Sequence, residues 1–331
     1  MHERIRGLDS LRFLCATLVV LGHIGIPVPL SVALATNIQN GLANLFNSPA
    51  AVIVFFVISG FCIHYPYQTR TVLPLYSYYT RRLIRILVPA GAAIGLWRAL
   101  GEIPQAPDFG IFWSVLCEVI YYLLYPLLFL LRKKFTWEQL ITATMLLALG
   151  LTMANLELLR IAHNGYTALG LWTWLVGLPC WLMGCWLAEN YTHFPELSMA
   201  RLALVRGAIF LTSIALRVVK FHVASPLASN CFTLNLFACA LVGWLGLEIG
   251  YYRNPKNTPR FEKLGLWSYS LYLLHPIGHR FLFLPANLHW PKFTLHSATL
   301  LLAFVVPYIF YLIVERPSHR LARYVAARKN S

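Results

Sequence analysis

The sequence predicts an all-α fold: a polytopic integral membrane protein with about ten transmembrane helices and both termini cytoplasmic. Of its 331 residues, 58% are hydrophobic and only 12% are charged, whereas soluble domains carry roughly 25% charged residues. The apolar residues gather in stretches of about 20, the length that crosses a bilayer. The basic residues fall mainly in alternate loops between those stretches.

Each apolar stretch is expected to form one membrane-spanning helix. No linker, composition shift or long internal repeat divides the chain, so residues 1–331 are predicted to form a single transmembrane domain. The expected spans are 11–29, 49–67, 83–100, 111–131, 138–156, 169–188, 203–220, 230–250, 264–284 and 294–314.

The net charge of +15 is explained by membrane topology, so no nucleic-acid partner is expected. Both ends of the chain and alternate loops hold clusters of basic residues, such as residues 132–134. Because clustered Lys and Arg stay in the cytoplasm, both termini are placed there. The opposite loops hold only scattered cations: Arg98, Arg160, Arg217, Lys220, Arg280 and Lys292.

The first apolar run is interpreted as a retained helix, and the cysteines are interpreted as packing residues. The first apolar run is longer than the core of a signal peptide and contains His23, so we expect it to be retained despite a possible cleavage site near residues 33–35. All seven cysteines lie in apolar segments. They lack the spacing of disulfides or zinc ligands, so they are expected to pack in the core, and no metal site is expected.

Arg12 and His23 are the first polar residues to need an explanation, because titratable groups inside a bilayer cost roughly 2.5 to 3.5 kcal/mol. They lie eleven residues apart in RFLCATLVVLGH. On a helix this spacing gives a common face and a rise of about 16 Å, with His23 beyond the membrane midplane. The alternative interpretation is that Arg12 is a positive-inside anchor and His23 is a histidine hydrogen-bonded in the core.

Glu118 and His275 fall near the depth of His23. Counting residues from each span end places all three within about one helical turn of depth. A carboxylate beside a histidine can fix its tautomer, which is the arrangement of a general base. The alternative is that Glu118 and His275 only make hydrogen bonds within the core. Pro276 is expected to kink the helix directly after His275. Ser59 is interpreted as a packing or helix-contact residue.

The segment YTRRLIRILVP holds more arginine than topology requires. Arg82 and Arg85 are three residues apart and share a helix face, with Arg81 beside them. Guanidinium groups bind phosphate well, so this face predicts a phosphate-bearing ligand arriving from the cytoplasm. A positive-inside cluster is the alternative.

These motifs together resemble the membrane-bound acyltransferase-3 family, bacterial enzymes that O-acylate cell-envelope and exported polysaccharides. The resemblance implies a ten-span acyltransferase core in the bacterial cytoplasmic (inner) membrane, in a short form without an appended extracytoplasmic domain. Six strings occur in the family's order along nearly the whole chain: IRGLDSLRFLCATLVVLGH, VIVFFVISGF, RRLIRILVP, FWSVLCEVIYYLLYPLL, YSLYLLHP and VERPSHRL.

The resemblance also implies roles for single residues. The family's basic residue and histidine match Arg12 and His23, and that histidine is the favoured catalytic base. The family's arginine pair matches Arg82 and Arg85, associated with the acyl-CoA donor, and Arg12 is either an anchor or a further donor contact.

The aromatic-serine-glutamate motif of the family matches Trp113, Ser114 and Glu118. Many members carry a second acid and a glutamine after that glutamate, where this chain has Val119 and Ile120, so more weight falls on Glu118. The resemblance implies substrate or supporting roles for Trp113 and Ser114, and we expect the same of Tyr122 and His275.

The expected function is acyl transfer, most simply of acetyl, from cytoplasmic acyl-CoA to a hydroxyl of an extracytoplasmic or lipid-linked saccharide. The partners are the acyl-CoA, the saccharide and the bilayer. Direct transfer and an acyl-histidine intermediate both fit, and the sugar and the oligomeric state stay open. A transporter or flippase for lipid-linked sugars is the main alternative, and a structural or sensory membrane protein is another.

Overall fold

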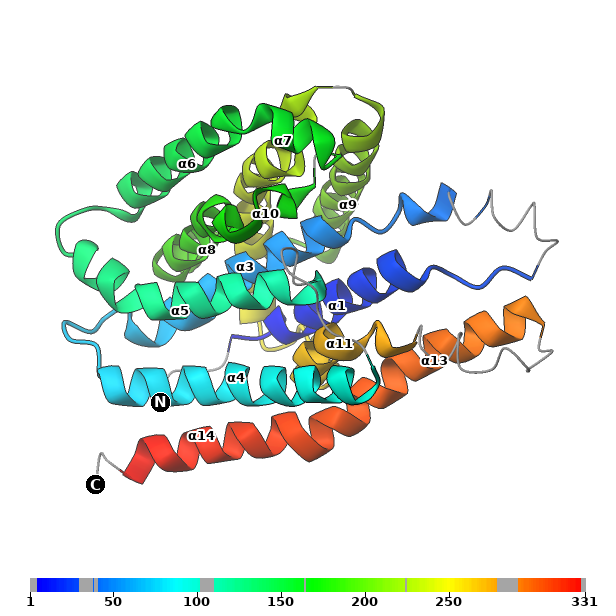
Figure 1. Cartoon of the computed structure of the whole chain (residues 1–331). Coiled ribbons are helices and arrows are strands. Elements are labelled where there is room, and N and C mark those ends of the chain that lie inside the picture. Colours follow the sequence, from blue (N-terminus) through cyan, green and yellow to red (C-terminus); the bar gives the residue numbers. More distant parts are fainter. Residues whose placement is uncertain are drawn as a thin grey trace. The chain divides into compact units, whose positions relative to one another are not determined.

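The structure is a computed structural model that describes residues 5–29, 38, 41–101, 110–163, 165–223, 225–278 and 291–328. Within these residues every regular element is a helix, which confirms the all-α prediction (Figure 1). All seven cysteines are free thiols, and five of them are buried.

Seven helical stretches in the described residues are long and apolar enough to cross a membrane, and each overlaps one expected span. The count of ten and the cytoplasmic termini stay predictions. The seven stretches are Gly41–Tyr67, Trp113–Leu131, Trp137–Ala154, Tyr166–His193, Met199–His222, Asn230–Arg253 and Phe293–Ala327.

The other three expected spans differ from the helices found. At 11–29 the structure has α1 (Leu8–Ile24), so the expectation of helix up to residue 29 is wrong. Gly25 has a φ of +81° and its N–H donates to the Leu21 carbonyl at 2.9 Å, a left-handed cap that ends the helix. At 83–100 the structure has α4 (Leu75–Ala99), which begins earlier than expected.

The expected span 264–284 is broken. A 3-10 turn, η6 (Leu264–Trp267), leads into the short helix α11 (Ser268–Leu274), which ends just before His275 and Pro276. Proline lacks the N–H that a continuing helix needs, and helical residues resume at Ile277 and Gly278, so the break lies where the kink was predicted. Residues 279–284 lie outside the described residues.

The chain folds into two compact units. The prediction of a single domain stays a prediction. Unit 1 comprises Met1–Leu11, Pro49–Leu75 and Gln105–Glu262, and unit 2 comprises Arg12–Ser48, Tyr76–Pro104 and Lys263–Ser331.

Unit 1 is a helix bundle with α8 in its middle (Figure 1). Helix α8 packs against α5, α6 and α10. Its apolar residues surround the helix, and nearly all are buried, as expected for a core helix. Helix α9 is peripheral, with 6% of its apolar window buried. The helices are α3 (Ser48–His64), α5 (Trp113–Leu131), α6 (Trp137–Ala154), α7 (Leu156–Ile161), α8 (Thr173–Asn190), α9 (Met199–His222) and α10 (Asn230–Arg253).

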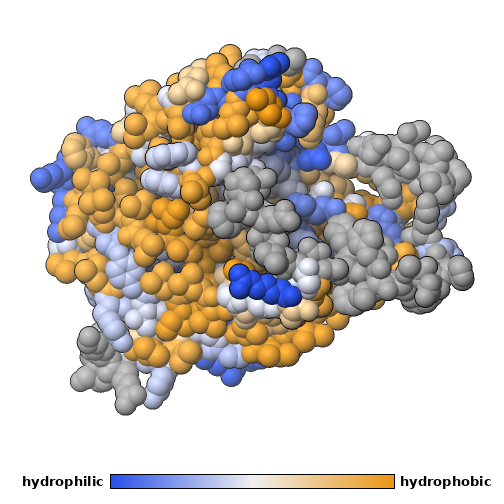
Figure 2. Space-filling view, in the orientation of Figure 1, coloured by the Kyte–Doolittle hydropathy of each residue, from blue (hydrophilic) through white to orange (hydrophobic). Residues whose placement is uncertain are grey.

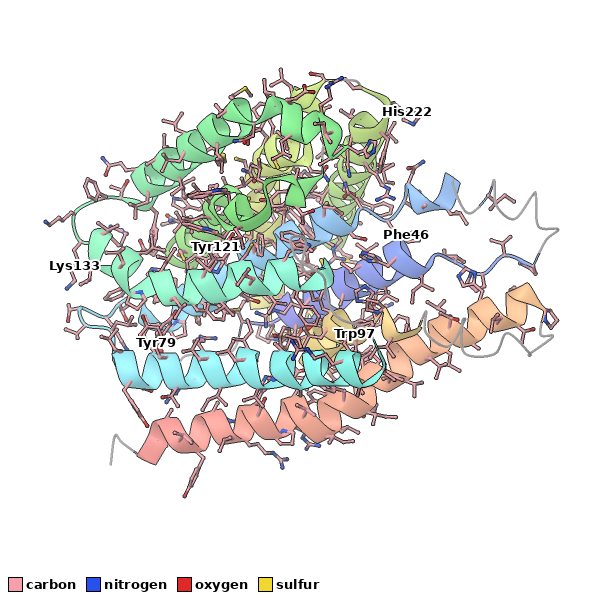
Figure 3. The ribbon with its side chains drawn as sticks, viewed as in Figure 1. Phe46, Tyr79, Trp97, Tyr121, Lys133 and His222 are labelled. Atoms are coloured by element: carbon pink, nitrogen blue, oxygen red, sulfur yellow. The ribbon has the colours of Figure 1, made fainter. Side chains whose placement is uncertain are left out.

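Helices α3 and α8 cross with their backbones almost in contact. A Cβ at Gly60 would lie 1.9 Å from the Trp181 carbonyl oxygen, and one at Gly184 would lie 2.0 Å from that of Val57. Small residues permit this approach in membrane helices. Tyr121, on α5, donates to the Trp174 carbonyl at 2.8 Å and fixes α5 against α8 (Figure 3).

Unit 2 contains α1, α4 and α11 together with one long, nearly continuous helix. This consists of α13 (Lys292–Phe310), a π-helical turn η7 (Tyr311–Glu315) and α14 (Arg316–Arg328). Helix α4 runs beside α14 (Figure 1). Trp97, on α4, donates to the Leu273 carbonyl at 3.4 Å and ties α4 to α11 (Figure 3).

Large apolar side chains cover much of the face seen in Figure 2. In the described residues, the strongly exposed large apolar side chains include Leu204 at 76%, Ile313 at 69% and Leu211 at 66%. Contiguous apolar surface of this kind marks contact with lipid or a partner, and here it lies on helices of membrane-spanning length.

The α3–α8 crossing gives a stability prediction. Gly184→Ala should destabilise the protein by about 1 to 3 kcal/mol, because the new methyl group overlaps the Val57 carbonyl. Gly150→Ala on α6 is the matched control, since nothing lies within 4 Å of its added Cβ. Thermal unfolding in detergent should show a lower Tm for Gly184→Ala only, and equal Tm values would contradict the packing.

Candidate functional site

His23 lies in the last turn of α1, where two other groups contact its ring. Its Nδ1 is 2.8 Å from the Val19 carbonyl oxygen, and the Nε2 of His275 is 3.3 Å from the same Nδ1. The two ring centroids are 4.9 Å apart. Unit 2 therefore brings together two of the histidines that the sequence singled out.

The carbonyl oxygens decide which ring nitrogens carry protons. A carbonyl can only accept, so His23 Nδ1 carries the hydrogen that it donates to Val19. His275 Nδ1 likewise donates to the Tyr272 carbonyl at 2.8 Å, which leaves its Nε2 as an acceptor for His23. In neutral His23 the lone pair therefore sits on Nε2, the nitrogen that can act as a base.

His23 lies closer to a helix end than expected, because α1 ends one residue later at Ile24 rather than at residue 29. Its depth in the membrane stays a prediction. Arg12 and His23 do share α1, so their expected rise of about 16 Å holds. His275 is fully buried and follows α11 directly.

Glu118, on α5 in unit 1, is held by two hydroxyl groups. Ser59 on α3 donates to Oε1 at 2.6 Å, and Tyr122 donates to the same oxygen. Trp181 on α8 in turn donates to Ser59 Oγ at 3.2 Å. Ser59 is therefore a helix-contact residue, as expected, and its hydroxyl also orients the carboxylate.

Trp113 and Ser114 begin the same helix as Glu118. The Trp113 ring packs against Tyr166, with centroids 5.5 Å apart, and edge-on against Phe56 at 6.1 Å. Ser114 is buried. These aromatic contacts position the N-terminal turn of α5, one to two turns from Glu118.

Two of the predicted arginines act on Glu315, a buried carboxylate in η7. Glu315 accepts from the Ser270 N–H at 3.1 Å and from the Ser270 hydroxyl. The positive charges of both Arg12 and Arg85 act on this carboxylate. Arg82 lies half-buried on α4, three residues before Arg85.

Arg85 Nε donates to His319 Nε2 at 3.1 Å. The accepting nitrogen therefore carries no proton. Glu315 lies 3.7 Å from the same nitrogen, so this approach is not an ion pair with a charged histidine. Arg85 therefore holds the His319 ring through this one hydrogen bond.

Sequence reasoning missed Ser270, Glu315 and His319 as members of this group. The signal was present, since a glutamate ends the last apolar run and a histidine follows four residues later in VERPSHRL. Residues four apart share a helix face.

The predicted site residues divide between the units. His23, His275 and the three arginines belong to unit 2, and Glu118, Trp113, Ser114 and Tyr122 belong to unit 1. Within unit 2, the Val19 carbonyl and His275 orient the His23 ring.

A comparison with known families identifies the chain. The family described as an acyltransferase domain matches residues 5–314. The chain belongs to the acyltransferase-3 family. With its apolar helices, this membership identifies a multi-pass membrane protein and supports an acyl-transfer activity. No curated protein and no solved structure matches the chain.

The His23 tautomer can be measured. In bilayers, nitrogen-15 spectra of histidine-labelled protein at a pH where His23 is neutral should show a protonated Nδ1 and an unprotonated Nε2. The signal is assigned by its loss in His23→Gln, with exposed His222→Gln as the control. A protonated Nε2 on neutral His23 would contradict the assignment.

Proposed function

We propose that the protein transfers an acyl group, acetyl in the simplest case, from acyl-CoA to a saccharide hydroxyl, and that it does so in the bacterial cytoplasmic membrane. The orientation of the His23 ring is the observation that supports this most. Its Nδ1–H is committed to Val19 and His275, so Nε2 is the basic nitrogen. Because the chain belongs to an acyltransferase family, the reaction proposed for this base is acyl transfer.

In the proposed reaction His23 Nε2 removes the proton of the sugar hydroxyl. The oxygen forms a bond to the thioester carbonyl carbon, and the carbon–sulfur bond then breaks. The departing CoA sulfur takes the proton back from the imidazolium, so protons and electrons balance. Attack by Nε2 itself, giving an acyl-histidine, is the alternative route.

His275 and Glu118 are proposed to assist in different ways. His275 accepts the Nδ1–H of His23 and so keeps the ring oriented while it becomes an imidazolium. Within the described residues both hydrogen bonds to Glu118 end on Oε1. The other oxygen, Oε2, is therefore suited to accept from a sugar hydroxyl.

Arg82 and Arg85, with Arg12 as a further contact, are proposed to bind the phosphates of the donor. Arg85 is held in place through Nε by His319. A fixed guanidinium loses less freedom when it binds phosphate, which favours tight binding. Arg12 lies about 16 Å along α1 from His23, a distance that an extended pantetheine arm can cover in order of magnitude.

His23→Ala should abolish acyl transfer by purified protein while CoA binding stays close to that of the unchanged protein. The loss is expected to exceed about a hundredfold, because the base is removed and the fold is not. Labelled acetyl-CoA, with saccharide acceptors or with water, measures turnover. His222→Ala, at the exposed end of α9, is the control and should keep full activity. Full turnover by His23→Ala would sink the proposed mechanism.

The double variant Arg82→Ala/Arg85→Ala should weaken CoA binding by about tenfold or more, since charge-assisted bonds to phosphate are lost. Equilibrium binding of labelled CoA measures the effect. The exposed cations Lys134 and Arg201, changed together to alanine, provide a control with the same change in charge. Unchanged CoA affinity in the Arg82/Arg85 variant would remove these residues from the donor site.

A further inference from the structure

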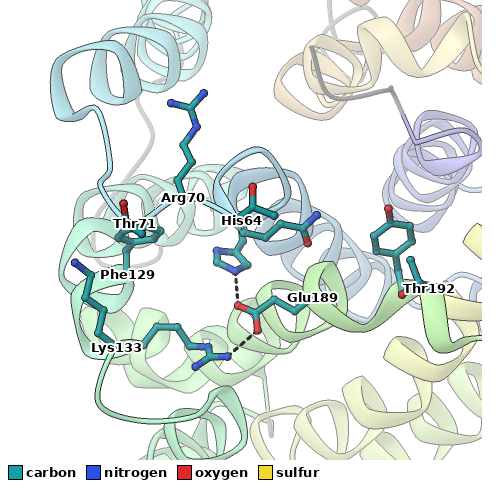
Figure 4. A pocket seen from close by; sticks show the side chains of 11 residues that line it. His64, Arg70, Thr71, Phe129, Lys133, Glu189 and Thr192 are labelled. Atoms are coloured by element: carbon teal, nitrogen blue, oxygen red, sulfur yellow. Dashed lines mark hydrogen bonds and ion pairs between the residues drawn. The ribbon is translucent and has the colours of Figure 1, made fainter.

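A cavity of about 820 Å³ lies in unit 1, where the C-terminal ends of α3, α5 and α8 meet. His64 ends α3, Arg132 and Lys133 follow α5, and Glu189 stands at the end of α8 (Figure 4). Arg70 contributes from the segment after α3. None of these residues has a role in the proposed acyl transfer.

Positive charge predominates in this cavity. Arg70, Arg132 and Lys133 line it, and Glu189 is the one carboxylate among the lining residues that the structure describes. Arg132 Nη2 donates to Glu189 Oε2 at 2.8 Å, so those two charges compensate each other. The neutral lining residues with hydrogen-bonding side chains are Gln68, Thr69, Thr71, Tyr191 and Thr192.

Glu189 belongs to a network that fixes Arg132 in place. Its Oε1 accepts from Trp137 Nε1 at 2.8 Å and lies 2.9 Å from Nε2 of buried His64. His64 Nδ1 in turn lies 2.9 Å from the hydroxyl of Tyr125. With these partners Glu189 serves as an anchor, and the dashed lines in Figure 4 mark its bonds to His64 and Arg132.

The Arg132 guanidinium is therefore a preorganised donor at the cavity wall. It lies over the Trp137 ring, 6.0 Å from the centroid. Its Nε is buried and makes no hydrogen bond within the described part of the chain. A guanidinium held in this way binds an anion at a reduced cost in conformational entropy.

The helix dipole and the positive-inside rule account for cations at helix C-termini. They do not account for a concave site lined by three cations together with hydroxyl and amide groups. They also do not account for a hydrogen-bonded network that fixes one guanidinium. This set of donors matches a phosphate group, which offers several acceptor oxygens and negative charge.

We propose that this cavity binds a phosphate group, carried by an anionic phospholipid headgroup or by a soluble phosphate compound. Arg70 and Lys133 supply exposed positive charges. Arg132 supplies a guanidinium group that Glu189 holds in place. The proposal is independent of the reaction proposed for His23.

Inorganic pyrophosphate, labelled with phosphorus-32, serves as the soluble probe. Binding to the full chain in neutral-lipid nanodiscs is compared with binding by Arg70→Gln/Lys133→Gln. These two cations are exposed and make no contact to Glu189, so the fold should be retained. Lys134→Gln/Arg201→Gln is the control, with the same loss of charge at residues that do not line the cavity. The same chains are purified from mixed lipid, and bound phosphatidylglycerol is counted by native mass spectrometry.

The proposal predicts that the Arg70/Lys133 variant loses about tenfold or more in affinity for one probe, while the control keeps its affinity. Loss confined to phosphatidylglycerol identifies a lipid headgroup, and loss of pyrophosphate binding identifies a soluble phosphate compound. Equal binding of both probes by variant and control, or binding of neither probe by the unchanged chain, would overturn the proposal. His23→Ala should bind both probes normally.

Discussion

A polar side chain on an apolar helix is most stable when its hydrogen-bond partner lies within the protein, because lipid offers none. His23 and His275 meet this condition by donating Nδ1–H to the carbonyls of Val19 and Tyr272 on their own helical turns. These local bonds fix both tautomers. The interactions that satisfy the two rings therefore also determine that Nε2 is the basic nitrogen of His23.

In each unit a carboxylate holds or attracts arginines, buried Glu315 in unit 2 and half-buried Glu189 in unit 1. In unit 2, Glu315 is held by Ser270 and lies within the field of Arg12 and Arg85. In unit 1, Glu189 fixes Arg132. Each carboxylate offsets part of the positive charge and limits the motion of a long side chain. A guanidinium fixed in this way is prepared for an anionic ligand. This supports the proposed binding of the acyl donor by the unit 2 arginines and the proposed phosphate site at Arg132 in unit 1.

The helices of the core were predictable because apolar length is a local property of the sequence, as for α5 and α10. Helix ends were less predictable: α1 ends before residue 29 because Gly25 takes a positive φ. His23 could be singled out as a polar residue in an apolar run. Its bond to His275 could not, because equal depth does not fix rotation. Ser59 was expected to contact another helix, but its bond to Glu118 could not be predicted, because that contact exists only once α3 and α5 pack. Glu315 was overlooked beside the basic tail that follows it.

Mass spectrometry of envelope and exported glycans, from cells with and without the gene, tests the central claim most directly. The proposed function predicts a saccharide that carries an acyl group only when the gene is present. The mass difference would identify the acyl group and its carrier together. Identical acylation of all glycans in both strains, with the protein present in the membrane of one, would contradict the account.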